Sequence, residues 1–286
     1  MASPEDGGST DSSGNGAVGD DGAAQPDLGE QPEPDASADV PAPPPMLPAP
    51  TALASLGNGL VLALSLDDGG GSEEVRDDAP AMNMVTLHDL DLPQSWVPGR
   101  FGLGLDFKGM GGTIRIAPNE AINSVAHGLS MAAWIFLPAS GTDGGTIIAR
   151  RGSGTNGFVF SLVVVADKLQ MRLNSGNGYN LDLRSTTTVP RGAWVSVVAT
   201  FDVNVARLYI NGKSVGSGPY LLGLPPDVSS VYAGGSQPVN PGKVLDPFAG
   251  TIDDVMMWNR QLSASEAMAI AGGARPPQAR APAAKR

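Results

Sequence analysis

The stretch AWVSVVATFDVNVARLYINGKSVGS, residues 193–217, indicates the fold class of this chain. Its two runs AWVSVVATF and VARLYI are rich in β-branched and aromatic residues and have the length of strands. Asp202, between them, can accept backbone N–H groups ahead of it and start a turn. Asn211 and Gly212 follow the second run, and both tolerate the positive φ that a type I′ hairpin turn requires. The stretch therefore predicts consecutive antiparallel strands.

Runs of the same kind continue on both sides, separated by clusters of Gly, Asn, Asp and Pro. They predict further strands at 59–66, 102–107, 113–117, 130–137, 146–151, 157–165, 168–174, 230–235 and 251–258. Short strands divided by turn signals, without the long helical periods of βαβ units, favour an all-β sandwich or barrel. One short helix is expected near the C-terminus, where Ser263 and Glu266 match a capping box and Gly272 ends the run.

The first fifty residues differ from the rest in composition and charge. They contain ten Asp or Glu and no Lys or Arg, so the net charge of −11 for the whole chain leaves −11 + 10 = −1 for residues 51–286. A segment with so few large apolar residues cannot bury enough surface to offset its ordering entropy. We expect a disordered acidic tether over 1–55, a folded domain over 56–273 and a basic Pro/Ala-rich tail over 274–286. A spacer is the favoured role of the tether, and a binding tail for a basic partner is the alternative.

Several classes of protein are disfavoured by what the sequence lacks. There is no Cys, which excludes a disulfide framework and thiol catalysis. No apolar run approaches the ~18 residues of a transmembrane segment, and the N-terminus carries no recognisable signal peptide. The four basic residues of the C-terminal tail are typical of a solvated chain end rather than of a nucleic-acid-binding arm. The protein is expected to be either cytoplasmic or exported, with its leader outside this sequence.

Five segments, taken in order, carry a resemblance to a known family. They are GLVLALSLDD, GRFGLGLDFKG, LSMAAWIFLP, RGAWVSVVATFD with ARLYINGKSVGS, and the closing GTIDDVMMWNRQLSASE. Together they resemble the laminin-G-like domain of the concanavalin A-like lectin/glucanase superfamily, over about three-quarters of the chain. The resemblance implies an antiparallel β-sandwich, a concanavalin A-like jelly roll, with one short C-terminal helix.

The same resemblance carries expectations about function and location. It implies a non-catalytic binding module, with a carbohydrate as the favoured ligand and a protein–protein adhesion or assembly module as the alternative. A glycoside hydrolase is less favoured, because the Glu-x-Asp-x-x-Glu strand common in hydrolases of this fold is absent. Bacterial members are usually exported, and the acidic tether resembles that of surface lipoproteins. We therefore expect a cell-surface or extracellular protein, with a glycan or surface protein as partner and a possible lipid anchor outside this sequence.

Two adjacent aspartates in the last predicted strand raise the question of chemistry. Because side chains alternate along a strand, Asp253 and Asp254 are expected to point apart, with Asp253 inward and Asp254 toward solvent. The resemblance implies that Asp253 binds a structural calcium ion, with Asp67 and the carbonyl of Gly109 as candidate neighbours. The alternative is that Asp253 accepts backbone N–H groups. Lys108, which replaces an aspartate of the family pattern, favours this alternative.

A small set of residues could contact a ligand. Trp96 lies in a loop outside the family pattern, where it could stack on a sugar or close the edge of the sandwich. Asn174, Asn177 and Tyr179 belong to a Gly-rich loop of the type that often presents polar contacts, although a structural turn is the simpler interpretation.

The remaining tryptophans fall on strands of the family pattern. We expect Trp134 and Trp194 to fill the space between the two sheets, and Trp258 to pack against the C-terminal helix. All three are thus interpreted as core residues rather than as ligand contacts.

Overall fold

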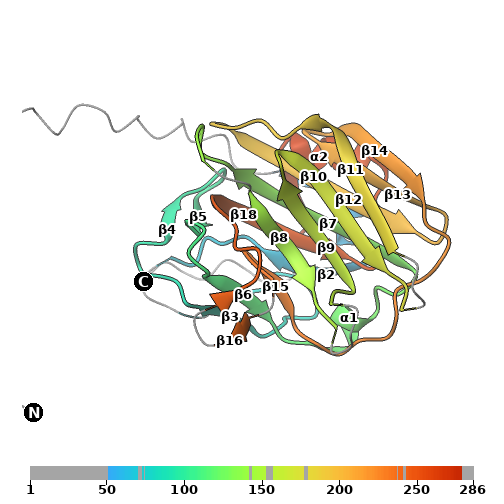
Figure 1. Ribbon diagram of the computed structural model, residues 1–286, viewed down its shortest axis with the longest axis horizontal. Coiled ribbons are helices and arrows are strands. Elements are labelled where there is room, and N and C mark those ends of the chain that lie inside the picture. The colour runs from blue at the N-terminus through green and yellow to red at the C-terminus, as the bar shows by residue number, and fades with distance from the viewer. Residues whose placement is uncertain are drawn as a thin grey trace, which may run out of the picture. The chain divides into compact units, whose positions relative to one another are not determined.

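Two antiparallel sheets lie face to face in the computed structural model and enclose the main hydrophobic core (Figure 1). The structure describes residues 51–69, 73, 75–141, 144–152, 157–176, 180–236, 238–240 and 243–278. The chain divides into two units, Met1–Ala42 and Pro43–Arg286, and all described residues belong to the second. The sandwich expected from the sequence is confirmed.

The first sheet has seven strands in the order β11-β10-β9-β8-β15-β6-β3. Their bounds are β3 Val85–His88, β6 Thr113–Ile116, β8 Gly145–Arg150, β9 Phe160–Val165, β10 Lys168–Asn174, β11 Asn180–Thr188 and β15 Val231–Ala233. Every neighbouring pair in this sheet is antiparallel.

The second sheet has eight strands in the order β14-β13-β12-β7-β18-β5-β4, with β2 also paired to β18. Their bounds are β2 Leu60–Leu64, β4 Trp96–Pro98, β5 Leu103–Asp106, β7 Gly128–Phe136, β12 Trp194–Asp202, β13 Val205–Ile210, β14 Lys213–Pro219 and β18 Thr251–Trp258. The strand β18 has β7 on one edge and shares its other edge between β5 and β2.

Shorter elements complete the domain. Two-stranded pairs are formed by β1 Thr51–Ala52 with β19 Ala274–Arg275, and by β16 Pro238–Asn240 with β17 Lys243–Val244. The helices are the 3₁₀ helix η1 Ala54–Gly57, the single-turn α1 Glu120–Asn123 and α2 Ala264–Ala271. Since β1 and β19 belong to the fold, the folded part extends beyond the expected bounds of 56 and 273.

The local signals in the sequence produce the expected turns and cap. Asn211 and Gly212 have φ of 48° and 73° and join β13 to β14. The Asp202 carboxylate accepts the N–H groups of Asn204 and Val205 after β12. At the start of α2, the Ser263 and Glu266 pair forms the full capping box. These features depend on neighbours in sequence, which is why the sequence predicts them.

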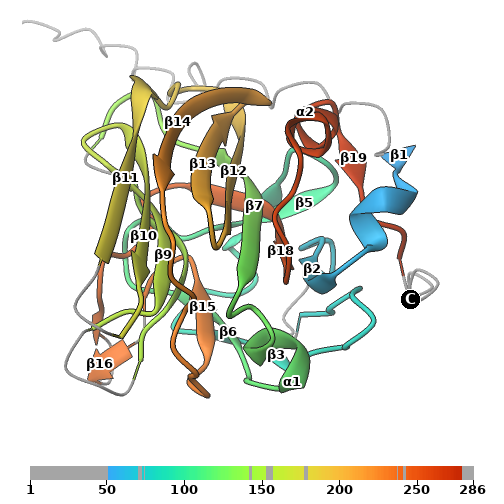
Figure 2. The same cartoon turned by 90° about the vertical axis from the view of Figure 1, so that its right-hand side faces the viewer.

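A second hydrophobic cluster lies on the outer side of the eight-stranded sheet. Trp258 is fully buried there, and its Nε1–H donates to the carbonyl of Leu56 at 2.6 Å. The cluster also contains Ala267 and Ile270 of α2, so the expected packing of Trp258 against the helix is confirmed. Figure 2 shows α2, β1 and β19 together on this side of the sheet.

Two other tryptophans lie elsewhere than the sequence suggests. Ala133 and Ile135 of β7 point into the main core, so Trp134 points to the opposite face of the strand. There its ring contacts Phe101 edge-on at 5.9 Å between centroids. Trp194 also points away from the core and is only half buried. The prediction that both fill the space between the sheets is wrong, because a strand pattern does not show which face of the strand covers the core.

Candidate functional site

The adjacent aspartates lie where β2 and β5 meet on one edge of β18. The start of β18 pairs with β5, and Val255 onward pairs with β2. On the other edge, the register with β7 shifts between Asp253 and Met256, which marks a β-bulge. Asp254 has a positive φ of 52° within this bulge. The bulge cancels the alternation of side chains, so Asp253 and Asp254 are both buried, at 0% and 3% exposure, and the prediction that Asp254 faces solvent is wrong.

Asp253 is enclosed by the loop between β4 and β5. Its Oδ2 accepts the backbone N–H of Phe101 at 3.0 Å, and its Oδ1 has no hydrogen-bond partner among the described residues. A Cβ at Gly99 would lie 2.8 Å from Oδ2, so only glycine leaves room for the carboxylate there. The backbone-accepting role suggested as the alternative for Asp253 is therefore observed for one of its two oxygens.

Arg275 supplies the positive charge that pairs with Asp254 in this cluster. Its Nε and Nη2 bind the two carboxylate oxygens of Asp254 at 2.6 and 2.5 Å. Its Nη1 lies 3.6 Å from Asp67 Oδ2, and the guanidinium carbon lies 5.1 Å from the centre of the Phe101 ring. Arg275 comes from β19, in the segment that the sequence suggested was a solvated tail. That assignment is wrong for Arg275, whose side chain is only 15% exposed.

Asp67 holds the same loop from the other side. Its Oδ1 accepts the N–H of Leu103 at 2.9 Å. Gly102, between the two pinned amides, has φ of 70°, and a Cβ there would lie 2.0 Å from Asp67 Oδ1. The GRFGL segment is thus fitted to two carboxylates, and its glycines are required by close approach.

Burial controls the protonation of the two aspartates. Burial and then the neighbouring charge of Asp254 raise the pKa of Asp253 well above its ordinary value. Burial also raises the pKa of Asp254 to about 7, against the opposing charge and hydrogen bonds of Arg275. Among the described residues no ion pair reaches Asp253, so it is the carboxyl that we expect to retain its proton.

The residues around Asp253 do not fit a calcium ion. Calcium takes six to eight oxygen ligands, most of them charged or carbonyl oxygens. Here Arg275 occupies the free oxygens of Asp254 and approaches those of Asp67. Gly109 donates its N–H to the carbonyl of Phe248 at 2.9 Å, and neither residue is among the hydrogen-bond partners of Asp253. Within the described part of the chain, no group of three Asp, Glu, His or Cys side chains could hold a metal ion.

The raised pKa values predict that stability falls as pH rises. In the unfolded chain these carboxyls titrate near 3.8, whereas in the folded chain Asp254 titrates at about 7 and Asp253 also well above 3.8. Between these values the folded state holds protons that the unfolded state releases, so raising the pH favours unfolding. The melting temperature should decrease from pH 5 to pH 8. Asp253→Asn, which mimics the protonated acid, should reduce this slope and stabilise the domain at pH 8.

The control is Asp182→Asn on an exposed carboxylate. Burial would raise the pKa of Asp182, but hydrogen bonds from Gln170 and Arg184 hold it below the ordinary value. The stability that ionised Asp182 contributes is lost only at lower pH, so Asp182→Asn should not change the slope of melting temperature against pH between pH 5 and 8. Calcium or EDTA should leave the melting temperature unaltered. A melting temperature that rises with calcium and depends on Asp253 would contradict the assignment of Arg275 as the cation of this cluster.

A second candidate site is the outer face of the seven-stranded sheet, opposite its core-facing side (Figure 2). The cross-strand partners form a continuous row over this face. The row consists of Asp182, Arg172, Ser161, Ala149, Tyr232 and Arg115, on β11, β10, β9, β8, β15 and β6. These residues alternate with members of the main core and are absent from it, so their side chains point outward. We call this row and its neighbour Gln170 the open face.

Hydrogen bonds organise one half of the open face. The Gln170 side chain is fully buried, donates to Asp182 and accepts a hydrogen bond from Arg172 at 2.9 Å. Ser161 is only 5% exposed, and its Oγ has no hydrogen-bond partner among the described residues. Beside Ser161 the row continues with the small Ala149 and then with the ring of Tyr232. An aromatic ring, a hydroxyl group without a partner and polar planar groups thus lie along one line, although Tyr232 and Ala149 are only 9% and 2% exposed, so that a ligand can reach only a small part of the ring.

The ligand residues suggested by the sequence are divided between different places. Asn174 ends β10 on the same side as Gln170 and Arg172, and its Oδ1 accepts the N–H of Gly176 at 2.8 Å. Asn177 and Tyr179 lie outside the described residues. Trp96 is on β4 of the other sheet, half buried and packed against the main core, an arrangement that favours the edge-closing alternative.

Sequence inspection missed the open face itself. No motif marks Tyr232, Ser161 or Arg172, because each is an ordinary strand residue. The available signal was the alternation in KLQMRLN and NLDLR, in which polar residues recur at every second position. Alternation shows that one face of a strand is polar, but only the register shows which strands share that face.

Comparison with known proteins identifies the fold family. The family model Laminin_G_3, described as the concanavalin A-like lectin/glucanases superfamily, matches residues 108–268. No curated protein matches the sequence significantly. The match covers more than half of the chain and confirms the resemblance carried by the sequence segments.

Solved structures share the fold at low sequence identity. The binding domain of Paraclostridial Mosquitocidal Protein 1 has a TM-score of 0.57 and 17% identity, over 76% of this chain and 52% of that one. The ligand binding domain of botulinum neurotoxin serotype D, solved with N-acetylneuraminic acid, has a TM-score of 0.57 and 16% identity, over 77% of this chain and 52% of that one. Domain 4 of AbnA, an extracellular arabinanase from Geobacillus stearothermophilus solved with arabinotriose, has a TM-score of 0.56 and 18% identity, over 74% of this chain and 98% of that one. This chain therefore spans about half the length of the toxin domains and nearly all of the arabinanase domain.

Proposed function

We propose that this chain, which belongs to the concanavalin A-like lectin/glucanases superfamily, is a non-catalytic binding module for carbohydrate. The observation that carries the proposal is the open face, where Tyr232 lies in register with the hydroxyl of Ser161 and the guanidinium of Arg172. An aromatic ring can cover the apolar face of a sugar, and the polar groups can bind its hydroxyls. The complexes of the serotype D toxin domain with N-acetylneuraminic acid and of the arabinanase domain with arabinotriose support this ligand class by analogy.

The small space beside the two buried aspartates argues against catalysis by them. Asp253 and Asp254 are buried together with raised pKa values, a property often found in catalytic carboxyls. However, the cavity beside Asp254 has a volume of only about 20 Å³, room for about one water molecule. A glycoside cannot reach these carboxyls, and their contacts indicate a structural role. We therefore propose that the protein binds its ligand without turnover.

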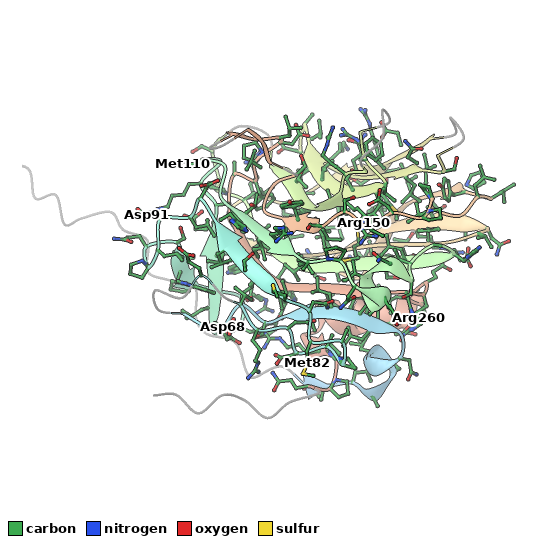
Figure 3. All side chains as sticks on the ribbon, turned by 90° about the horizontal axis from the view of Figure 1, so that it is seen from below. Asp68, Met82, Asp91, Met110, Arg150 and Arg260 are labelled. Atoms are coloured by element: carbon green, nitrogen blue, oxygen red, sulfur yellow. The ribbon has the colours of Figure 1, made fainter. Side chains whose placement is uncertain are left out.

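The alternative of a protein-binding module has weaker support. A protein interface usually includes a contiguous apolar patch. The exposed apolar side chains here include Met82 and Met110, at 60% and 77% exposure, and Figure 3 shows them on different parts of the molecule. Leu221 and Leu222 form a smaller exposed pair after β14. Scattered residues of this kind do not favour a protein partner over a glycan.

We propose an exported location, at the cell surface or outside the cell. The family resemblance and the extracellular arabinanase from which one similar domain comes support this location. Within the described residues, no helix combines the length and hydrophobicity needed to cross a bilayer. A lipid anchor outside this sequence remains part of the proposal, with the acidic tether as its spacer.

The carbohydrate-binding proposal predicts a specific loss on changing Tyr232. Full-length protein should be titrated with arabinan and with a panel of glycans by calorimetry or on an array. Tyr232→Ala should weaken binding about fivefold or more, since aromatic stacking contributes roughly 1 kcal/mol or more. Tyr232→Phe keeps the ring and should retain most of the affinity. Trp96→Ala, on the other sheet, should leave the affinity unchanged in a folded protein.

Two outcomes would contradict the proposal. One is the absence of binding to any glycan by the folded wild-type protein. The other is binding that depends on Trp96 and not on Tyr232, which would place the ligand on the other sheet. New reducing ends that form during incubation with a polysaccharide, and disappear when one acid is changed, would contradict the non-catalytic assignment.

A further inference from the structure

We propose that the ligand of the open face is an anionic polysaccharide, which carries carboxylate or sulfate groups along its chain. This inference rests on the proposed carbohydrate binding and adds the charge and the minimum extent of the ligand. It is carried by the distribution of charge on the seven-stranded sheet, by the hydrogen bonds that orient Arg172, and by the positions of the cations in the row.

The charge of this face is opposite to that of the chain. The strands of the seven-stranded sheet place four cations on the outward side, namely Arg115, Lys168, Arg172 and Arg184, and one anion, Asp182. Their sum is 4 − 1 = +3, whereas the chain as a whole carries −11 and residues 51–286 carry −1. Cations concentrated on one face of an otherwise acidic protein attract anionic ligands. Several of these cations can then be contacted by one molecule of a polymer.

The cations are available to a ligand. Within the described part of the chain, neither Arg115 nor Arg172 forms an ion pair with a carboxylate. The single anion, Asp182, is engaged by Gln170 and Arg184, and its lowered pKa keeps it ionised at neutral pH. Gln170 is fully buried, so its hydrogen bond fixes the position of the Arg172 guanidinium before a ligand arrives. A planar guanidinium held in this way matches the geometry of a carboxylate or sulfate group.

The row also indicates how much of a ligand is recognised. Neighbouring strands lie about 4.8 Å apart, so Arg115 is one strand from Tyr232, and Arg172 is three strands, or about 14 Å, on the other side. One sugar ring on Tyr232 can therefore approach Arg115 but not Arg172. Between them lie Ala149 and Ser161, only 2% and 5% exposed, and the intervening units would pass over these small side chains. A chain that crosses the strands and bears repeated negative charges would contact both cations.

Matched pairs of polymers test the charge of the ligand. The first pair is polygalacturonate and its methyl-esterified form, which have the same backbone with and without charge. The second is dextran sulfate and dextran. Full-length protein should bind the charged member of at least one pair at least about tenfold more tightly than the neutral member. The affinity should fall as salt is added, because exposed charges are screened over about 10 Å at 0.1 M ionic strength.

Variants of the open face separate specific contacts from general charge. Arg172→Gln should weaken binding of the charged polymer about tenfold or more, as expected for the loss of a charge-assisted hydrogen bond. Lys213→Gln makes the same charge change on β14 of the other sheet and should have little effect. Asp182→Asn removes the only anion of the face and should tighten binding. All three variants should keep the melting temperature close to that of the wild type if the effects are on binding.

The outcomes distinguish this inference from the proposed function. If a neutral glycan binds through Tyr232 and neither Arg172→Gln nor salt changes its affinity, carbohydrate binding stands and the anionic ligand is excluded. If Lys213→Gln weakens binding as much as Arg172→Gln, net charge alone is responsible and the open face is not the site. If no polymer or glycan binds, both proposals fail.

Discussion

Arg275→Ala is expected to destabilise the domain by about 3–5 kcal/mol, the usual result of removing one partner from a buried ion pair. The change would leave the Asp254 carboxylate, which is 3% exposed, next to Asp253 without a cation. It would also remove the guanidinium that lies against the Phe101 ring and approaches Asp67. Urea unfolding at pH 7 measures the loss directly, provided that the slope with denaturant is unchanged.

Two further variants make the test specific to the buried pair. Arg184→Ala removes an arginine from an exposed pair, with 62% and 49% of the two side chains accessible, and should cost no more than about 1 kcal/mol. The double variant Asp254→Asn with Arg275→Met replaces the pair by neutral groups and should lose less than the sum of the single changes. A loss below about 1 kcal/mol for Arg275→Ala would show that the C-terminal segment does not stabilise the domain through this contact.

Trp258→Ala is expected to cost about 3–5 kcal/mol, in the range measured for large-to-small changes of buried aromatic residues. Trp258 is fully buried between β18, η1 and α2, where it packs with Leu262, Ala267 and Ile270. Truncation would leave a cavity and would also leave the carbonyl of Leu56 without its donor. Thermal or chemical unfolding, monitored by circular dichroism, should show the loss.

Trp194→Ala provides a control of the same chemistry at a half-buried position. Its ring contacts Phe136 at 5.8 Å between centroids but is outside both buried clusters. The expected loss is clearly smaller, because less apolar area is removed from contact. Trp258→Phe should recover most of the packing but not the hydrogen bond to Leu56. Equal losses of stability at Trp258 and Trp194 would contradict the finding that Trp258 is fully buried and Trp194 only half buried.

Local sequence signals were sufficient for much of the fold. The hairpin at Asn211 and Gly212, the capping box of α2, and most strands of the core follow from residues close together in the chain. The family segments also predicted the sandwich that the matched family confirms. In contrast, β11 was not predicted, because its residues 184–188, RSTTT, contain no apolar run. That strand is stabilised by pairing with β10, and one of its faces is polar because it remains uncovered.

The buried charge cluster shows where sequence reasoning ends. Alternation along a strand predicts Asp253 inward and Asp254 outward. However, Ile252 and Val255 both point into the main core, and the β-bulge between them leaves both aspartates buried on the opposite face, where the loop between β4 and β5 covers Asp253. The strand pattern alone does not reveal a bulge of one residue. The Pro and Ala neighbours of Arg275 predict a solvated tail, and only the pairing of β1 with β19 brings Arg275 to Asp254.

The sequence by itself determined the class of the fold, the acidic composition of the first fifty residues and the residues that could carry charge. It did so because strand propensity, turn geometry and net charge are properties of short segments. Only the tertiary structure decided which charges meet. The open face joins residues of six strands that are spread along the chain from position 115 to position 232, and the buried cluster joins Asp67 to Arg275 across 208 positions of the chain. Contacts over such separations depend on register and sheet order, which no local pattern encodes.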